Sequence, residues 1–297
     1  MSKPEHFYKF CTAKVAKLNL SMRRLRFSSP LRFNDPFDCY FPPGFSNLRR
    51  NVPASEKRHH AILTGKEVLP ADSCAAFNMA PLIGLMDTVP AEVIKRSRKT
   101  HRARVFAVAD QFNRESQIEW DGMARRFRLL SLCAEGKNPL LWAHYANCHR
   151  GVAFEFDACY TGRIAEEISF AAAEPVKYRK RVPRAYSQKD FIESTLGLNP
   201  LPDSAQTWLP LMLTKSLEWS YEKEWRIMRV AGEEGRSLFT DLAFSPRSLS
   251  RIFLGCRILT RDRRAIERLA TGDFGHVEIH QARQSQTRFA LEFDRIH

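Results

Sequence analysis

A chain of 297 residues, 44% of them hydrophobic, is long and apolar enough to bury a core, which excludes an intrinsically disordered protein. Its formal net charge of +14 favours anionic partners, such as nucleotides, nucleic acids or acidic protein surfaces. The seven cysteines are scattered without a CxxC pair, which excludes a zinc ribbon and favours reduced, buried thiols; we expect no metal site.

The sequence also bears on where the protein acts. The first nine residues contain no apolar signal-peptide core, and no stretch approaches the roughly 18 apolar residues of a membrane helix. We therefore expect a cytoplasmic protein with no membrane partner, although export by a machine that needs no cleaved signal stays open. The sequence does not indicate an oligomeric state.

The N-terminal segment predicts a strand, a helix and a second strand. Residues 7–10 are predominantly aromatic, residues 12–20 have helical spacing, and residues 25–27 alternate apolar with basic side chains. Residues 33–38 then combine asparagine, aspartate and proline, whose side chains favour a turn by bonding or fixing their own backbone. We expect a polar loop between aromatic anchors.

Residues from about 52 to 126 differ from what precedes them. They are rich in alanine, have helical periodicity and contain proline breaks, which predicts helices at 54–64, 72–87 and 90–125. No Gly/Ser-rich linker bounds this stretch. We therefore predict a single domain over residues 1–297, with residues 53–126 as a helical insertion.

The rest of the chain mixes strands and helices at unequal intervals. The predicted strands are 129–133, 151–156, 175–179, 225–230, 252–254, 277–279 and 289–293. The predicted helices are 139–147, one beginning after Asp203-Ser204 with a kink at Pro210, and 260–269 capped by Thr260. Irregular spacing argues against a doubly wound fold and favours α+β, with a mixed or mostly antiparallel bent sheet.

Some stretches of sequence are distinctive as a set. In chain order they are residues 7–10 (FYKF), 25–39 (LRFSSPLRFNDPFDC), 131–157 with LWAHYA at its centre, and 215–227 ending in WSYEKEWRI. Their order and spacing resemble the bacterial family known as domain of unknown function 2971. The resemblance covers nearly the whole chain except the insertion, and it implies no activity by itself.

The chain is also similar to ADP-ribosyltransferases, whose early strand carries an aromatic beside a basic residue. Here that pair is Tyr8-Lys9, followed by Ser131 before a helix and by Glu222-Lys223-Glu224 before a strand. The chain has Lys9 where arginine or histidine is usual, and Ser-Leu-Cys where Ser-Thr-Ser is usual. The similarity implies NAD as a substrate and an α+β fold with a bent sheet like that of ADP-ribosyltransferases.

Breaking the bond between nicotinamide and ribose builds positive charge on the sugar, which a nearby carboxylate stabilises. Glu224 is the first candidate for this catalytic role and Glu222 the second, because both point to one side if the segment is extended. Lys9 would offer a charge to a phosphate. The alternative interpretation is that Glu222 or Glu224 pairs with Arg226 or Lys223 as ordinary surface charges.

Other residues are candidates for binding NAD or a second substrate. Trp142 and Tyr145 lie on a predicted helix and are candidates to stack on a nicotinamide or adenine ring, with core packing as the alternative. His144 beside them is a candidate acid or base, or a structural histidine. Asn34 and Asp35 either line the pocket or hold a rigid turn.

These residues lead to two hypotheses. The first is an NAD-dependent ADP-ribosyltransferase-like enzyme that uses Arg226 as well to bind substrate, with a role as a toxin or in phage defence suggested by this kind of chemistry. The second is a nucleic-acid-binding protein, with the basic stretch from Lys177 to Arg184 flanked by Tyr178 and Tyr186. Its enzymatic form is a magnesium nuclease that takes ligands from the carboxylates Asp35, Asp38, Glu155, Asp157, Glu222 and Glu224.

Overall fold

The structure is a computed structural model, and it describes residues 2–40, 48–64, 66–68, 90–162, 167–184, 186–195, 204–231 and 237–296. Contacts divide the chain into two compact units. Unit 1 comprises residues 1–39, 123–181 and 213–297, and unit 2 comprises residues 40–122 and 182–212. Unit 2 holds most of the predicted insertion together with residues 182–212. That the chain forms a single domain over residues 1–297 stays a prediction.

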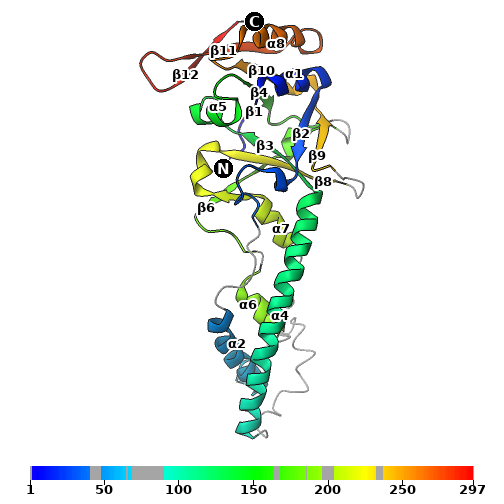
Figure 1. Ribbon diagram of the computed structural model, residues 1–297, viewed down its shortest axis with the longest axis vertical. Helices are drawn as coiled ribbons and strands as arrows, with labels where there is room; N and C mark the ends of the chain where they lie inside the picture. The colour runs from blue at the N-terminus through cyan, green and yellow to red at the C-terminus, as the bar shows by residue number, and fades with distance from the viewer. Residues whose placement is uncertain are drawn as a thin grey trace. The chain divides into compact units, whose positions relative to one another are not determined.

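Unit 1 is built on one large sheet (Figure 1). Its strands are β1 (His6–Cys11), β2 (Arg24–Ser28), β3 (Phe127–Cys133), β4 (Val152–Asp157), β5 (Glu174–Pro175), β8 (Glu224–Val230), β9 (Phe239–Ala243), β10 (Leu249–Leu254), β11 (Glu278–Gln284) and β12 (Leu291–Arg295). The main path runs β12-β11-β10-β4-β1-β3-β2-β9, while β8 pairs with both β3 and β5. Among the described strands of this sheet, β10 and β11 are parallel and the other pairs are antiparallel. The α+β class with a mixed, mostly antiparallel sheet is therefore confirmed.

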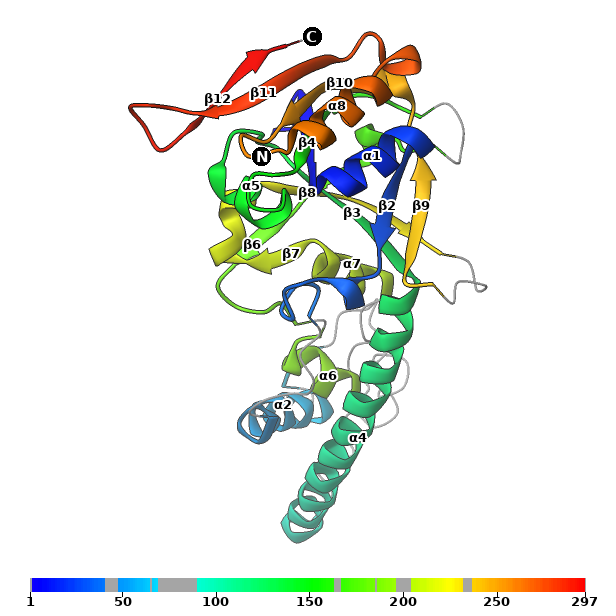
Figure 2. The same cartoon turned by 45° about the horizontal axis from the view of Figure 1, so that its top comes forward.

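The two faces of this sheet bury different side chains because neighbouring residues of a strand point in opposite directions. On β4, Phe154 belongs to the main core, whereas Ala153 belongs to a second, smaller cluster with Phe10 and Trp142. Helices α1 (Ala13–Met22) and α8 (Thr260–Leu269) lie side by side over the main core, as Figures 1 and 2 both show. Helix α5 (Pro139–Tyr145) supplies the second cluster.

Unit 1 also contains two short strands outside the large sheet and several short 3₁₀ helices. These are the parallel strands β6 (Lys177–Arg179) and β7 (Thr214–Ser216), and the 3₁₀ helices η1 (Pro30–Arg32), η4 (Phe170–Ala172), η5 (Leu217–Glu222), η6 (Pro246–Ser248) and η7 (Gly272–Phe274). The sequence did not predict β7 or β9, because β7 is only three residues long and β9 is half-buried along its length.

Helix boundaries show where local signals succeed and where one was wrong. Thr12 caps α1 by accepting a hydrogen bond from the Val15 N–H at 3.2 Å, as a helix starting there requires. Thr260, predicted to cap the last helix, is instead its first residue, and Leu259 occupies the cap position without a side-chain bond. The predicted helix at 72–87 lies outside the described residues.

Unit 2 contains the helices α2 (Leu48–Leu63), α6 (Gln188–Thr195), α7 (Ser204–Met212) and most of α4 (Ala91–Arg126), whose C-terminal end belongs to unit 1. The rings of Trp120 and Trp208 lie 5.4 Å apart between α4 and α7. Arg102, from the basic cluster at the start of α4, donates to Glu56 with a shortest distance of 2.6 Å. That arginine therefore pairs within the protein, while Lys95 and Lys99 are exposed.

Candidate functional site

Unit 1 contains a cavity of about 260 Å³ whose walls come from segments far apart in the sequence. The lining residues are Tyr8, Lys9 and Phe10 of β1, Arg32, Phe33, Asn34 and Asp38 of the following loop, Ser131 and Cys133 of β3, Tyr145 of α5, and Lys215, Glu222 and Glu224. The structure therefore brings Tyr8, Lys9, Ser131, Tyr145 and Glu224 to one place, together with Asn34 and Glu222. We call this cavity the carboxylate pocket.

The pocket lies where β1 and β3 meet. Their register pairs Tyr8 with Cys133, and beyond that pair the Lys9 ammonium donates to the carbonyl oxygen of Ser131 at 2.8 Å. The Ser131 carbonyl of β3 is thus bonded by a lysine side chain of β1 and not by a β1 backbone N–H. Burial lowers the pKa of Lys9, because the charged ammonium loses hydration there. The hydrogen bond to the Ser131 carbonyl holds the Lys9 side chain in place, and Lys9 is also the amine that β1 contributes to the pocket lining.

Glu222 and Glu224 converge, although the segment that carries them is not extended. Glu222 ends the 3₁₀ helix η5, Lys223 adopts a left-handed conformation with φ 46°, and Glu224 begins β8. The predicted strand at 225–230 is present as β8, but the condition of an extended segment at 222–224 is not met, since the chain turns at Lys223. Both carboxylates nevertheless reach the Lys215 ammonium, at 2.6 Å from Glu222 Oε2 and 3.0 Å from Glu224 Oε2.

Arg226 lies beneath this pair and joins it to the loop after β2. Its Nε and Nη2 donate to Glu224 at 2.8 and 3.1 Å, and Nη2 also donates to both oxygens of Asp38 at 2.8 and 2.7 Å. The predicted pairing of Glu224 with Arg226 occurs, but in the interior rather than on the surface, because both side chains are buried. Lys223, the other suggested partner, pairs with Glu135.

Burial and charge act differently on the two glutamates. Burial acts to raise the pKa of Glu224, but the charges of Arg226 and Lys215 outweigh it and hold that pKa well below its ordinary range. Burial also raises the pKa of Glu222, and there Lys215 offsets it only in part. For Lys215, burial acts to lower the pKa, and the surrounding carboxylates of Glu224, Asp38 and Glu222 outweigh it and raise it.

The tyrosines around the pocket fix the carboxylates in place. The Tyr145 hydroxyl donates to Glu222 Oε1 at 2.5 Å, and the Glu224 N–H donates to the Tyr178 hydroxyl at 2.7 Å. Tyr8 donates to Glu155 at 2.8 Å, and its ring lies against Gly136, where a Cβ would meet Tyr8 Cε1 at 2.5 Å. A glycine at 136 is thus needed for Tyr8 to occupy this position.

Four predicted binding residues do not line the pocket, and the first is Arg226, which is fully buried in the ion network. Trp142 is buried and donates through Nε1 to the Gly136 carbonyl at 2.8 Å, so it packs in the core. His144 is exposed, with its ring 6.1 Å from that of Trp219. Asp35 accepts from the Phe37 N–H at 2.9 Å and holds a turn, while its neighbour Asn34 reaches the pocket.

Sequence reasoning named Asp38 only as a candidate magnesium ligand, and it assigned no binding role to several other residues of the pocket. Asp38 and Lys215 are buried members of the ion network, and Arg32, Phe33 and Cys133 line the cavity. Lys215 lies seven residues before Glu222 and would have been found only by asking which cation neutralises two buried carboxylates. Asp38 follows a proline-containing turn, a position that favours an exposed aspartate as readily as a buried one.

The cation between these carboxylates is a lysine. Lys215 Nζ lies 2.6 to 3.6 Å from oxygens of Glu222, Glu224 and Asp38, which is where a bound cation would neutralise them. Within the described residues, no group of three or more histidine, cysteine, aspartate or glutamate side chains is arranged to hold a metal ion. A magnesium site is therefore not supported at this position.

Fold and pocket together define an α+β protein with a cavity built over a buried ion network. The family model described as "Protein of unknown function (DUF2971)" matches residues 141–227, the segment that contains most of α5, Lys215 and both glutamates. The predicted family resemblance is thus confirmed over this segment. No curated protein and no solved structure matches the chain. Within the described residues, no helix is both long and apolar enough to cross a membrane.

Proposed function

We propose that this protein is an enzyme that transfers ADP-ribose from NAD, with the carboxylate pocket as its active site. The observation that carries the proposal is the meeting of Tyr8, Lys9, Ser131 and two carboxylates around one cavity. These residues come from three strands and a 3₁₀ helix that are far apart in sequence. Apart from Lys9, which stands where arginine or histidine is usual, they are the residue types that the resemblance to ADP-ribosyltransferases implies.

The two glutamates differ in how much of their hydrogen-bonding capacity is left for a substrate. Arg226 and Lys215 together donate to both oxygens of Glu224, and the Ser131 side chain is a further hydrogen-bond partner. Glu222 receives one donor on each oxygen, from Tyr145 and Lys215, and keeps lone pairs for a further bond. In our proposal Glu222 contacts the ribose, and Glu224 holds Lys215 and Arg226 in place.

The reaction would proceed by cleavage of the glycosidic bond. The bonding electron pair leaves with nicotinamide, and the positive charge that develops on the ribose is stabilised by the Glu222 carboxylate. The acceptor then forms its bond to the same ribose carbon and loses its proton to a base, for which Glu222 is suited because its pKa is raised. Lys9 and Arg32 supply positive charge for the two phosphates, and the rings of Tyr8 and Tyr145 supply surfaces for stacking.

The test is incubation with labelled NAD and cell extract, comparing wild type with Glu222→Gln. Glu222→Gln should lower the rate by roughly 10²–10³, the scale for one well-placed electrostatic group. Glu218→Gln is the matched control, because Glu218 lies on the same 3₁₀ helix but is exposed, and it should leave the rate unchanged. A folded wild type that neither binds nor consumes NAD would end the proposal.

A second candidate function, nucleic-acid binding, is favoured by an exposed basic stretch in unit 1. Lys177, Arg179, Lys180 and Arg181 are exposed, which suits contact with phosphates. Tyr178, expected to stack on bases, instead turns inward to the Glu224 N–H. Contact here would therefore be electrostatic, and it predicts binding to single-stranded nucleic acid that weakens steeply with salt, measured by fluorescence anisotropy.

A further inference from the structure

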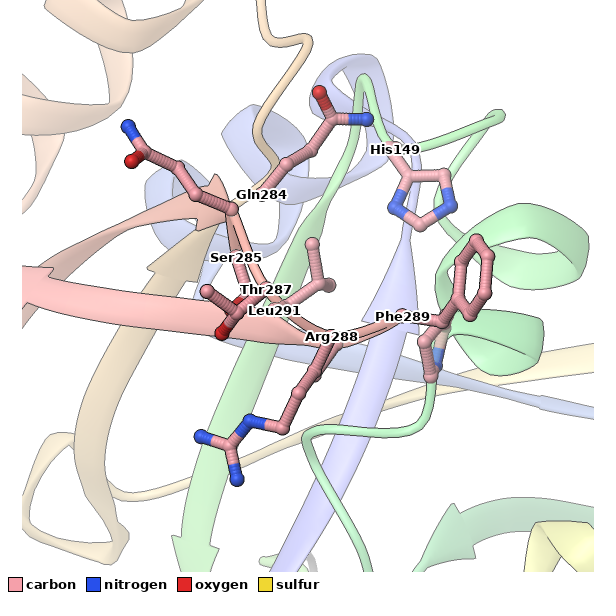
Figure 3. A pocket seen from close by; sticks show the side chains of 10 residues that line it. His149, Gln284, Ser285, Thr287, Arg288, Phe289 and Leu291 are labelled. Carbon is pink, nitrogen blue, oxygen red and sulfur yellow. The ribbon is translucent and has the colours of Figure 1, made fainter.

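A second cavity of about 570 Å³ lies elsewhere in unit 1, between the loop after α5 and the β11–β12 hairpin. It is lined by Pro139, by His149 and by the hairpin residues from Gln284 to Leu291, as Figure 3 shows. None of these residues lines the carboxylate pocket. We call it the hairpin pocket.

The loop that carries His149 has an unusual backbone. Asn147, Cys148 and His149 have φ values of 48°, 52° and 65°, the left-handed region that residues with a Cβ rarely adopt. The His149 N–H donates to the Trp142 carbonyl at 3.1 Å, and the His149 carbonyl accepts from the Arg257 N–H at 2.9 Å. Such strain persists where surrounding contacts enforce it, and it is concentrated at functional sites. His149 is therefore held at the wall of the cavity by a fixed backbone.

Two buried polar atoms of the hairpin pocket are unsatisfied. Among the residues that the structure describes, His149 Nδ1 and Ser285 Oγ are buried atoms without a hydrogen-bond partner. Buried polar groups are nearly always paired, so two such atoms on residues that line one cavity point to a ligand that pairs with them when it enters. Burial, together with the nearby Arg257, lowers the pKa of His149, so its neutral ring offers one donor and one acceptor.

The remaining groups of the cavity define which ligand would fit. Gln284 and Gln286 carry amides, which both donate and accept and which read the edges of nucleobases. The Phe289 side chain is fully exposed, at 106% of its reference area, so its ring is available for stacking. Arg288 extends away from His149 in Figure 3 and is the charged residue of the lining, which gives the cavity a cationic end.

We infer that the hairpin pocket binds a nucleobase, which hydrogen-bonds with His149, Ser285 and the glutamine amides and stacks on Phe289. Arg288 meets the phosphate attached to that base. The ligand is either a free nucleotide or one residue of a single-stranded nucleic acid, since both present the same base and phosphate. This inference does not depend on the proposed transfer of ADP-ribose, because the two cavities share no lining residue.

The test is to titrate the full chain with AMP and, separately, with a short single strand of oligo(dA), while recording the ring nitrogen resonances of the histidines. The His149 Nδ1 resonance should move on binding, whereas that of the exposed His144 should stay in place. Phe289→Ala should weaken binding roughly tenfold, the scale for loss of one stacked base. Ile118→Ala, an exposed apolar side chain of unit 2, is the matched control and should leave affinity unchanged.

The two probes separate the sources of the ligand. A response to AMP identifies a free nucleotide as sufficient, and a response to oligo(dA) but not to AMP identifies nucleic acid. Glu222→Gln should bind both probes as the wild type does, which separates this site from the carboxylate pocket. An unmoved His149 resonance with both probes at millimolar concentration, or unchanged affinity in Phe289→Ala, would overturn the inference.

Discussion

Arg226 and Arg251 each bridge two carboxylates from separate segments of unit 1, but water reaches them differently. Arg226 joins Glu224 to Asp38 with its side chain 0% exposed. Arg251 joins Glu155 to Glu278 with its side chain 41% exposed. Each arrangement places one arginine between two carboxylates at nearly the same distances, so the main difference between them is the burial of the arginine.

Burial changes what happens when one partner is lost. A charge stranded in the interior has neither water nor a counter-ion, whereas a charge left at a partly open site regains water. Loss of the Arg226 guanidinium therefore leaves two buried carboxylates without their shared cation. This network fixes the floor of the carboxylate pocket. The Arg251 network holds Glu155, which in turn accepts a hydrogen bond from Tyr8 of the pocket wall. Because Arg251 is partly exposed, its loss should destabilise the protein less than the loss of Arg226.

The largest expected effect is that of Arg226→Met. Removing the guanidinium leaves the buried Asp38 and Glu224 without their shared cation, so unfolding free energy should fall by about 3–5 kcal/mol. Urea denaturation followed by circular dichroism measures this loss. A loss under about 1 kcal/mol would show that the interior network does not behave as a buried one.

An intermediate effect, with a distinctive pH dependence, is expected for Glu224→Gln. Arg226 keeps Asp38 as a partner, so the loss at neutral pH should be about 2–3 kcal/mol, the scale of a hydrogen bond to a charged group. The lowered pKa of Glu224 means that its ionised form stabilises the fold above pH 4.5, its ordinary pKa, and that this contribution is lost as pH falls below it. The difference between wild type and variant should therefore shrink below pH 4.5, by up to about 1.4 kcal/mol per pH unit, which is the value for one proton.

Glu222→Gln is the control for Glu224→Gln, because the stability difference from wild type should change with pH in the opposite direction. Because the pKa of Glu222 is raised, the wild type gains stability relative to this variant as pH falls through the folded pKa. Denaturation curves at a series of acidic pH values measure both variants. If the two glutamine variants respond to acid in the same direction, the assignment of opposite pKa shifts is wrong.

The smallest effects belong to the exposed arginines. Arg251→Met should cost about 1–2 kcal/mol, because Glu155 is buried but keeps its bond from Tyr8. Arg283→Met removes a pair on the exposed hairpin, where Arg283 contacts Glu292 and Asp294, and it should cost less than about 1 kcal/mol. Thermal melts at low and high salt measure both, and a loss for Arg283→Met as large as that for Arg226→Met would remove the contrast.

Local sequence determined much of the fold of unit 1. Apolar residues in the segments around Phe154 and Trp225 predicted β4 and β8, and both strands bury most of their residues. Thr12 and Asn138 accept hydrogen bonds from the first turns of α1 and α5, so the starts of these helices are encoded within a few residues. The class α+β follows from the order of such elements.

The sequence predicted several residues of the site, but it did not predict which side chains are buried or how the backbone turns between them. The motifs around Tyr8, Ser131 and Glu224 are unusual enough to be singled out from the sequence, and all three residues line one pocket. The sequence could not assign Trp142 to the core rather than to a binding site, because an aromatic residue on a short helix suits either place. Lys223, between η5 and β8, adopts a positive φ, which non-glycine residues rarely do, so the sequence did not indicate the turn between Glu222 and Glu224.

The sequence by itself determined which elements form, because hydrogen bonds and side-chain alternation within a strand or helix depend on neighbours in the chain. Only the tertiary structure decided that Lys215 neutralises Glu222 and Glu224, and that Asp38 reaches Arg226 across 188 positions of sequence. The physical reason is that a buried charge is stabilised by whatever opposite charge the fold brings within about 3 Å, and such proximity is a property of the packed chain, not of any segment of it.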